Sequence, residues 1–396
     1  MIRIFLSAAA ASSLVLSSAA AQGGAAFVPD SASTRVNQMA LPTAAPARVD
    51  LPEGGMAMRM GLRGGRPEVE VMVNGRGPYR FVVETGAPFS IVTPRVAREI
   101  GLRTEGEDPQ ATVDSLRIGG AVLRTMRVSV MEVAPGVEGL LGLNSYRDLL
   151  LTVDYPRSEL RLSRGTLPAA NGRDLLAMTD LDGLWGVEMT VAGRPAMGVI
   201  DTQGERGFKI TPAEAQALPL AAAPVVTGTA SGPGIGTQQM GAARLNGTIR
   251  LGDVEFQRPI IHTVPMPPDY PQKEWNIGAE VLREFVVTMD QRSRVLRLAR
   301  ESRGPVAASP PLKGLGFRSA ARDGVRTVSQ VTAGSGAERA GIRAGDEVVS
   351  VDGRAAAGLS GDEWRALANG AAPLRIVLRR EGREIAMELT PEVLVQ

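Results

Sequence analysis

Short apolar runs dominate the chain between residues 61 and about 300. Runs such as Val69–Val73, Phe81–Val83 and Leu150–Val153 are rich in β-branched or apolar residues, and turns that contain glycine separate them. Runs of this kind, bounded by turn residues, favour β-strands. The pattern therefore predicts a mainly β architecture for this part of the chain.

The N-terminal end follows a different pattern. Arg3 precedes an apolar stretch that ends in Ala19-Ala20-Ala21, a small-residue site of the kind that a signal peptidase recognises. Several serines dilute the stretch, which makes it a poor membrane anchor. We therefore expect a cleaved signal peptide at 1–21 and a periplasmic or secreted protein without a stable membrane span. Residues 22–60, rich in Ala, Pro and Gly, are expected to form a flexible leader.

A second change in composition occurs near residue 301. The stretch 301–312 contains Gly304-Pro305 and Ser309-Pro310-Pro311, which indicates a linker. Residues 313–396 follow with a new composition and are expected to form a separate small domain.

An internal repeat divides the β-rich region. Val83-Glu84-Thr85 recurs as Ile200-Asp201-Thr202. Further segments recur in the same order: Thr93-Pro94 as Thr211-Pro212, Leu116–Gly119 as Ile249–Gly252, and Thr152–Asp154 as Thr288–Asp290. Because the order is kept, we interpret the region as one duplicated unit, with a first lobe at 61–166 and a second at 167–300.

Each copy of the repeat places an acid directly after an apolar strand. If the two copies pack about a twofold axis, Glu84 and Asp201 can meet at the interface. Two carboxyls about 3 Å apart cannot both ionise, so they share a proton. Such a pair can hold a water molecule while one carboxyl acts as a base and the other as an acid.

The composition leaves the carboxyl groups of Asp and Glu as the main candidates for catalytic groups. The chain has no cysteine and one histidine, which excludes disulfides, a thiol nucleophile, a thiolate zinc site and a pair of metal-binding histidines. We expect no metal and no cofactor. The 44 Lys and Arg residues balance 42 acids without a basic run, so no nucleic-acid partner is predicted. His262, Asp154 and Asp290 lie in or at the ends of predicted strands and are interpreted as structural.

The loop Glu84-Thr85-Gly86-Ala87 and the apolar-apolar-Gly elements Leu140–Gly142 and Asn276–Gly278 carry a family resemblance. Residues 66–300 resemble the retropepsin-like aspartic proteases, in a fused, pepsin-type form with two lobes that is seen in exported bacterial proteins. The resemblance implies two β lobes related by a pseudo-twofold axis.

The resemblance also implies roles for the paired loops. Glu84 and Asp201 stand where the two catalytic acids belong. The resemblance assigns support of the catalytic loops to Thr85, Gly86 and Thr202. Flaps that fold over a bound peptide are expected at 110–130 and 228–241.

Two positions depart from the family pattern. Position 84 carries Glu in place of Asp, which moves the carboxyl by about 1.5 Å, one carbon–carbon bond. Gln203 occupies the glycine position of the second loop, and Gly204 follows it. Charged residues lie near the same turn: Glu205, Arg206 and Lys209. A cation there would hold Asp201 ionised and hinder proton sharing with Glu84.

The C-terminal domain carries a resemblance of its own. The segments 314–317 and 345–353 have the order and spacing of a PDZ domain, a small α+β fold. Such a domain binds a peptide by adding it as a strand, and successive N–H groups of a loop hold the terminal carboxylate. A helix near 362–368 would line the groove. The resemblance assigns the carboxylate-binding loop to Leu315, Gly316 and Phe317. Phe317 and Ile342 also fit a role as core residues.

Three functions fit the sequence. The first is an exported aspartic-type endopeptidase in which Glu84 and Asp201 activate water against a peptide or protein substrate, while the PDZ domain recognises a protein C-terminus or an internal peptide. The second is a catalytically impaired adaptor that binds peptides in the same groove. The third is an all-β structural protein whose binding activity resides in the PDZ domain. We expect the first.

Overall fold

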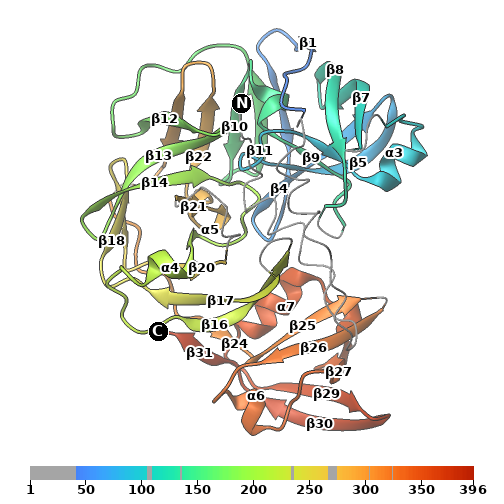
Figure 1. Ribbon diagram of the computed structural model, residues 1–396, viewed down its shortest axis with the longest axis vertical. Helices are drawn as coiled ribbons and strands as arrows, with labels where there is room; N and C mark the ends of the chain where they lie inside the picture. The colour runs from blue at the N-terminus through green and yellow to red at the C-terminus, as the bar shows by residue number, and fades with distance from the viewer. Residues whose placement is uncertain are drawn as a thin grey trace.

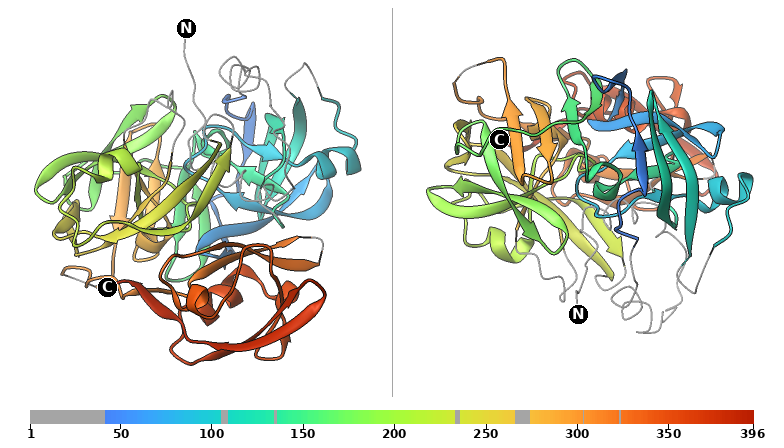
Figure 2. Two further views of the ribbon diagram at one scale, coloured as in Figure 1. Left: turned by 60° about the horizontal axis from the view of Figure 1, so that its bottom comes forward. Right: turned by 90° about the horizontal axis from the view of Figure 1, so that it is seen from above.

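The computed structural model of the chain describes residues 42–104, 109–133, 136–232, 236–265, 274–302, 304–322 and 324–396. The expected signal peptide and the expected leader up to residue 41 lie outside these residues. Figure 1 and Figure 2 show two β-rich halves side by side and a C-terminal domain packed beneath them. We call residues 48–163 the first half and residues 175–299 the second half. The fold is mainly β, as the apolar runs predict.

The strands of the first half form a sheet with a buried core. Its path is β1-β8-β6-β9-β5-β4-β3, and β7 pairs with β4 and β8. The bounds are β1 Arg48–Asp50, β3 Gly61–Arg63, β4 Arg66–Val73, β5 Arg76–Val83, β6 Ile91–Val92, β7 Gln110–Ile118, β8 Ala121–Val130 and β9 Gly139–Leu141, with the short helices α3 Pro94–Glu99 and η1 Leu143–Tyr146. The Thr93 side chain begins α3 by accepting the Val96 N–H.

The second half contains the same kinds of strand pairing. β14 lies parallel to β21 as β5 lies parallel to β9, and β15 lies parallel to β20 as β6 lies parallel to β8. The bounds are β12 Leu175–Leu181, β13 Leu184–Val191, β14 Arg194–Ile200, β15 Phe208–Ile210, α4 Pro212–Ala215, β16 Val225–Gly232, β17 Gly236–Arg244, β18 Thr248–Leu251, β19 Val254–Gln257, β20 Ile260–Thr263, β21 Trp275–Ile277 and α5 Ala279–Leu282.

A shared sheet joins the two halves. It combines β2 Met56–Arg59, β11 Glu159–Ser163 and β10 Leu150–Asp154 with β22 Val286–Asp290, β23 Val295–Ala299 and β12. β10 pairs with β22 at the centre, where Thr152 lies opposite Thr288 and their hydroxyl oxygens are 3.0 Å apart. The main hydrophobic core runs through both halves, so the two halves fold as one body.

The end of the expected leader belongs to this body. β1 pairs with β8, and β2 pairs with β11 with Met56 buried. The prediction of a flexible leader up to residue 60 was therefore wrong for residues 48–59, and the first half begins before residue 61. A strand of three or four residues shows little periodicity, and the partners of β1 and β2 lie far along the chain. The local pattern therefore could not identify these strands.

The hairpin β7–β8 does not have the place expected of a flap. β7 pairs with Val71–Val73, the end of β4 that lies farthest from Glu84, because Glu84 follows the opposite end of the β4–β5 hairpin. The turn of β7–β8 packs on the leader strands: a Cβ built on Gly119 would lie 3.1 Å from the Met56 sulfur. The expectation of a flap at 110–130 was therefore wrong. In the second expected flap, residues 233–235 between β16 and β17 lie outside the described residues.

The C-terminal domain is a small α+β unit with its own core. β24 Leu312–Gly314 pairs with β31 Glu392–Val395. A second sheet follows the path β25-β26-β27-β29-β30, with β28 on β27. Its elements are β25 Phe317–Arg322, β26 Val325–Val331, α6 Gly336–Arg339, β27 Glu347–Val351, β28 Arg354–Ala355, η2 Ala356–Gly358, α7 Gly361–Ala368, β29 Leu374–Arg380 and β30 Arg383–Leu389. Phe317 and Ile342 are both buried in this core.

Within the described residues, no helix combines the length and the apolar character needed to span a membrane.

Candidate active site

Two threonines tie together the loops that carry the acids. The Thr85 N–H donates to Oγ1 of Thr202 at 3.1 Å, and the Thr202 N–H donates to Oγ1 of Thr85 at 3.2 Å. Each hydroxyl then donates to a backbone oxygen of the opposite half: Thr85 to Ile200 at 2.7 Å and Thr202 to Val83 at 2.6 Å. All four groups are buried, so each hydroxyl satisfies a donor and an acceptor that water does not reach.

These two threonines, which we call the threonine brace, bring Glu84 and Asp201 together. Both side chains are fully buried, and their carboxyls lie within hydrogen-bonding reach of each other. Gly86 sits beside both acids. A Cβ built on it would lie 2.7 Å from Oε1 of Glu84 and 3.3 Å from Oδ1 of Asp201. A side chain at position 86 would therefore collide with the carboxyl pair, which explains why this loop needs glycine.

Four donors surround the Asp201 carboxylate. Oδ1 accepts the N–H groups of Gln203 at 3.1 Å and Gly204 at 2.7 Å. Oδ2 accepts Nζ of Lys209 at 3.0 Å and Nδ2 of Asn276 at 2.7 Å. One of the four donors is the Lys209 ammonium, so a positive charge lies directly against the Asp201 carboxyl.

Glu84 has the opposite environment. The Gly86 N–H donates to Oε1, while Oε2 has no hydrogen-bond donor among the described residues. Burial raises the pKa of Glu84 well above its usual value, and the charge of Asp201 raises it further. The surroundings of Glu84 therefore favour its neutral form.

The difference between the acids comes from two matched positions in the sheets. In the second half, Lys209 of β15 lies opposite Asn276 of β21. In the first half, Ile91 of β6 lies opposite Leu140 of β9. A lysine and an asparagine thus face Asp201 where an isoleucine and a leucine occupy the corresponding positions near Glu84. The two acids therefore have different neighbours at matched positions of the two copies.

Gly204 takes over the role of the glycine that the second loop lacks. Its N–H donates to Asp201, as the Gly86 N–H donates to Glu84. The turn is one residue longer, and Gln203 adds its own N–H to the same oxygen. The glycine of this loop is therefore displaced by one residue and not lost.

The other singled-out residues lie outside the pair. His262 is a buried residue of β20, and its Nε2 lies 3.8 Å from Oε2 of Glu280. Asp154 and Asp290 each accept a backbone N–H three residues later, from Arg157 and Ser293, which fixes the turns after β10 and β22. Among the described residues, no group of three His, Asp or Glu side chains could hold a metal ion.

The pKa of Glu84 makes the stability of the chain depend on pH. Folded Glu84 holds its proton above the ordinary value of 4.5, whereas the unfolded chain releases it there. Its contribution is therefore fully present below pH 4.5 and is lost as the pH rises toward the folded pKa. We expect Glu84→Gln to gain about 1.4 kcal/mol of unfolding free energy relative to the parent for each pH unit in that window. Urea denaturation at several pH values measures this gain.

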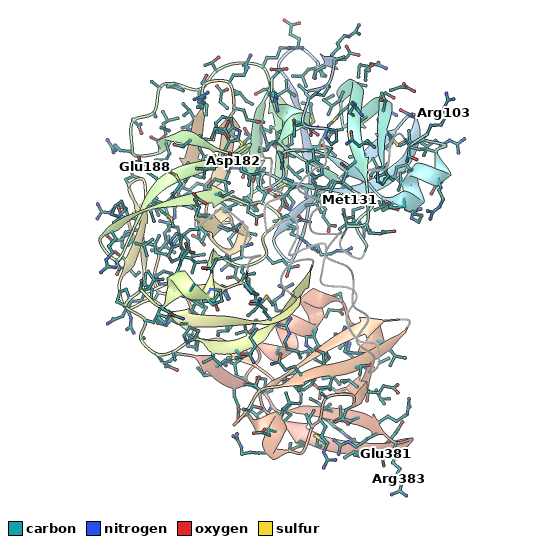
Figure 3. All side chains as sticks on the ribbon, viewed as in Figure 1. Arg103, Met131, Asp182, Glu188, Glu381 and Arg383 are labelled. Atoms are coloured by element: carbon teal, nitrogen blue, oxygen red, sulfur yellow. The ribbon has the colours of Figure 1, made fainter. Side chains whose placement is uncertain are left out.

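The control for this prediction is the exposed acid Glu188, which lies on the outer side of β13 (Figure 3). Glu188→Gln should track the parent at every pH. A Glu84→Gln variant that also tracks the parent would show that Glu84 is ionised in the folded chain.

Two family comparisons match the chain in separate regions. Residues 69–145, which contain Glu84 and Thr85, match the family described as aspartyl protease. Residues 327–380 match the family described as PDZ domain. Residues 69–145 therefore carry an aspartyl protease-like domain sequence, and residues 327–380 that of a PDZ domain. No curated protein matches the chain.

Similar solved structures each share only part of the chain. The photosystem II D1 C-terminal processing protease is 27% identical over 22% of this chain and 24% of its own, with a TM-score of 0.20. The HtrA3 PDZ domain bound to a phage-derived ligand is 22% identical over 21% of this chain and 88% of its own, with a TM-score of 0.19. A retropepsin-like aspartic protease from Rickettsia conorii is 20% identical over 30% of this chain and 94% of its own, with a TM-score of 0.24. The chain thus spans about a quarter of the length of the D1 processing protease.

In the PDZ domain, Leu315, Gly316 and Phe317 form the turn that enters β25. Leu315 and Phe317 are buried, and Gly316 has a φ of 73°, a value that favours glycine. The Gly316 carbonyl accepts the Thr332 N–H at 2.7 Å and the Ser335 hydroxyl at 3.1 Å. β25 lies at the edge of its sheet, and α7 packs beside it through Trp364, whose ring lies 5.9 Å from that of Phe317.

The second half contains one important residue whose role the sequence did not suggest. Asn276 belongs to the apolar-apolar-Gly element of the second copy, but its contact with Asp201 depends on the pairing of β15 with β21. A signal was present. A polar residue stands there in an element that is apolar in the first copy, at Leu140.

Proposed function

We propose that the chain is an aspartic-type endopeptidase in which Glu84 and Asp201 activate water, and that its PDZ domain binds a peptide or protein terminus. The observation that carries the proposal is the buried pair itself: Glu84, whose pKa is raised, lies beside Asp201, which Lys209 contacts, on loops joined by Thr85 and Thr202. Peptide-bond hydrolysis by such a pair needs one carboxyl in each protonation state.

The two acids divide the steps of hydrolysis between them. Asp201 takes a proton from water as the water oxygen bonds to the peptide carbonyl carbon. Glu84 gives its proton to the carbonyl oxygen, which produces a neutral tetrahedral diol. The proton on Asp201 then passes to the amide nitrogen as the C–N bond breaks, and Glu84 recovers its proton as the new carboxyl group forms. No metal or cofactor enters these steps.

The proposal is tested by incubating the full chain with a broad peptide mixture from acid to neutral pH and identifying the products by mass spectrometry. Cleavage that Glu84→Gln lowers by at least about 100-fold supports it, because the glutamine cannot donate the proton. A chain that cleaves nothing, or a Glu84→Gln variant as active as the parent, overturns it.

Glu84→Asp should increase the cleavage rate. Aspartate shortens the side chain by about 1.5 Å, and a misplacement of about 1 Å can cost 100-fold in rate. We therefore expect a gain of at least about tenfold in kcat/KM over the parent if the longer acid holds the proton away from its best position. A loss of activity in Glu84→Asp would show that the loops have adapted to glutamate.

A second candidate function is peptide binding without turnover. The observation in its favour is the Lys209–Asp201 contact of 3.0 Å, because a cation on a carboxylate weakens it as a base. Saturable binding of peptides without products, unchanged in Glu84→Gln, would support this adaptor.

We further propose that the protein acts outside the cytoplasm after cleavage behind Ala21. The alanine-rich site in the sequence supports this proposal. A mature protein from a secreting host whose first residue is Gln22 would agree with it, whereas a mature protein that retains Met1 would contradict it.

A further inference from the structure

β25 and α7, the two elements that line the peptide site in the PDZ resemblance, each touch the second half of the chain. On one wall, Arg318 of β25 donates to the Thr227 carbonyl of β16. On the other, Arg365 of α7 donates to Glu205 at 3.0 Å. Figure 1 shows β16 and β17 running alongside the PDZ domain near α7. The groove is therefore bounded by two elements that are each attached to the second half.

The contact through β25 is a close one. A Cβ built on Gly228 would overlap the Arg318 guanidinium, so a glycine beside Thr227 is what lets the arginine reach the carbonyl. Other contacts fix the same side of the domain. Val395 and Leu312 pack against Ala242, and the Arg244 guanidinium donates to the carbonyl oxygens of Gln396 and Ser309. This side of the PDZ domain is anchored by burial.

The contact through α7 reaches the catalytic loop. Glu205 directly follows Gly204, whose N–H donates to Asp201 at 2.7 Å. The side chains of Arg365 and Glu205 are about one-third exposed, so their ion pair is weak compared with the buried anchors on the other side. Arg66 also lies 3.6 Å from Oε1 of Glu205, so Arg365 is one of two cations beside this acid. The contact of α7 with the second half is therefore weaker than the contact of β25.

A bound peptide would push α7 and β25 apart. A PDZ ligand pairs with the edge strand β25 and places its side chains between that strand and α7. Phe317 and Trp364 now contact each other across this space. A ligand side chain that enters between them separates α7 from β25, and β25 is held in place by Arg318 and the buried anchors.

We propose that a peptide with a free C-terminal carboxylate and an apolar last residue, bound between β25 and α7, releases Glu205 from Arg365 and thereby activates the Glu84–Asp201 pair. The released loop relaxes the Gly204 donor on Asp201. A carboxylate that loses a hydrogen-bond donor accepts a proton more readily, and the first proposed step of hydrolysis requires Asp201 to accept one. This inference rests on the proposed peptidase activity, and the Arg365–Glu205 contact then acts as a restraint on it.

The experiment adds pentapeptides with a common C-terminal valine to the full chain and measures two quantities. The first is kcat/KM on a reporter peptide that the chain cleaves. The second is hydrogen exchange of the amides of residues 203–207, which does not depend on activity. The same pentapeptides with an amidated C-terminus are the ligand control, and tryptophan fluorescence reports occupancy of the groove beside Trp364.

We expect the carboxylate peptides to raise kcat/KM at least about fivefold and to speed exchange at 203–207, while the amidated peptides do neither. Arg365→Ala should show both changes without peptide and no further response. Arg383→Ala, at the far end of the PDZ sheet (Figure 3), should respond like the parent. Binding of the carboxylate peptides without a change in hydrogen exchange at 203–207 would overturn the coupling. An Arg365→Ala variant whose exchange or kcat/KM still changes when the peptides bind would also overturn it. If exchange responds but no peptide is cleaved, the coupling stands and the proposed peptidase function fails.

Discussion

Replacing Asp201 by asparagine should lower kcat/KM for peptide cleavage by at least about 1,000-fold. Asparagine has nearly the size of aspartate but cannot take a proton from water, so the first step of hydrolysis loses its base. The measurement is cleavage of one reporter peptide by equal amounts of parent and variant, with the fold of each checked by circular dichroism.

Two further variants serve as controls for this result. Asp201→Asn removes the counter-ion of Lys209, which is largely buried, and could destabilise the loop for that reason alone. The double variant Lys209→Met with Asp201→Asn removes the stranded cation and should be just as inactive. Glu188→Gln, an exposed acid of the same half, should keep full activity. Substantial activity in either Asp201 variant would remove Asp201 from the mechanism.

The second large effect is expected at the threonine brace. Thr85→Val keeps the shape of the side chain and removes its hydroxyl. The Thr202 N–H and the Ile200 carbonyl then lose their partners in a buried place. We expect a loss of about 2–4 kcal/mol in the free energy of unfolding, because each buried group left unpaired costs about 1–3 kcal/mol. Urea denaturation of the full chain measures it.

Thr85→Ser is the matched control, since serine keeps the hydroxyl and both bonds. Its loss should stay below about 1.5 kcal/mol, the cost of one buried methyl group. Thr202→Val should match Thr85→Val because the bonds of the two threonines are reciprocal. A stable Thr85→Val variant with unchanged cleavage would show that the loops do not depend on this brace.

Much of the fold could be predicted from local sequence because its strands are short, apolar and bounded by turns. The segment Val69–Val73 lies in β4, with Val69, Val71 and Val73 buried. The strand β2 could not be predicted, because four residues carry too little pattern and its partner β11 lies about a hundred residues away. The turn of hairpin β7–β8 was placed wrongly for a similar reason, since its position depends on pairing with β4.

The part of the candidate site that recurs in the internal repeat could be predicted from the sequence. The recurrence of an acid followed by threonine singled out Glu84 and Asp201 among 42 acids. The distribution of the proton between them was not predictable in the same way, because it depends on which residues of neighbouring strands face each acid. Lys209 was noticed as a charge near the turn, whereas the contact of Asn276 with Asp201 requires the register of β15 and β21.

The central claim is that Glu84 and Asp201 form a water-activating pair, and binding of a transition-state mimic tests it most directly. The mimic is an analogue of a peptide that the chain cleaves. In it, a tetrahedral carbon that carries a hydroxyl group replaces the scissile amide. A site that catalyses hydrolysis should bind it at least about 100-fold more tightly than the matched amide peptide, and Asp201→Asn should abolish the difference. Calorimetry on the full chain that gives equal affinities for both ligands in the parent would contradict the claim.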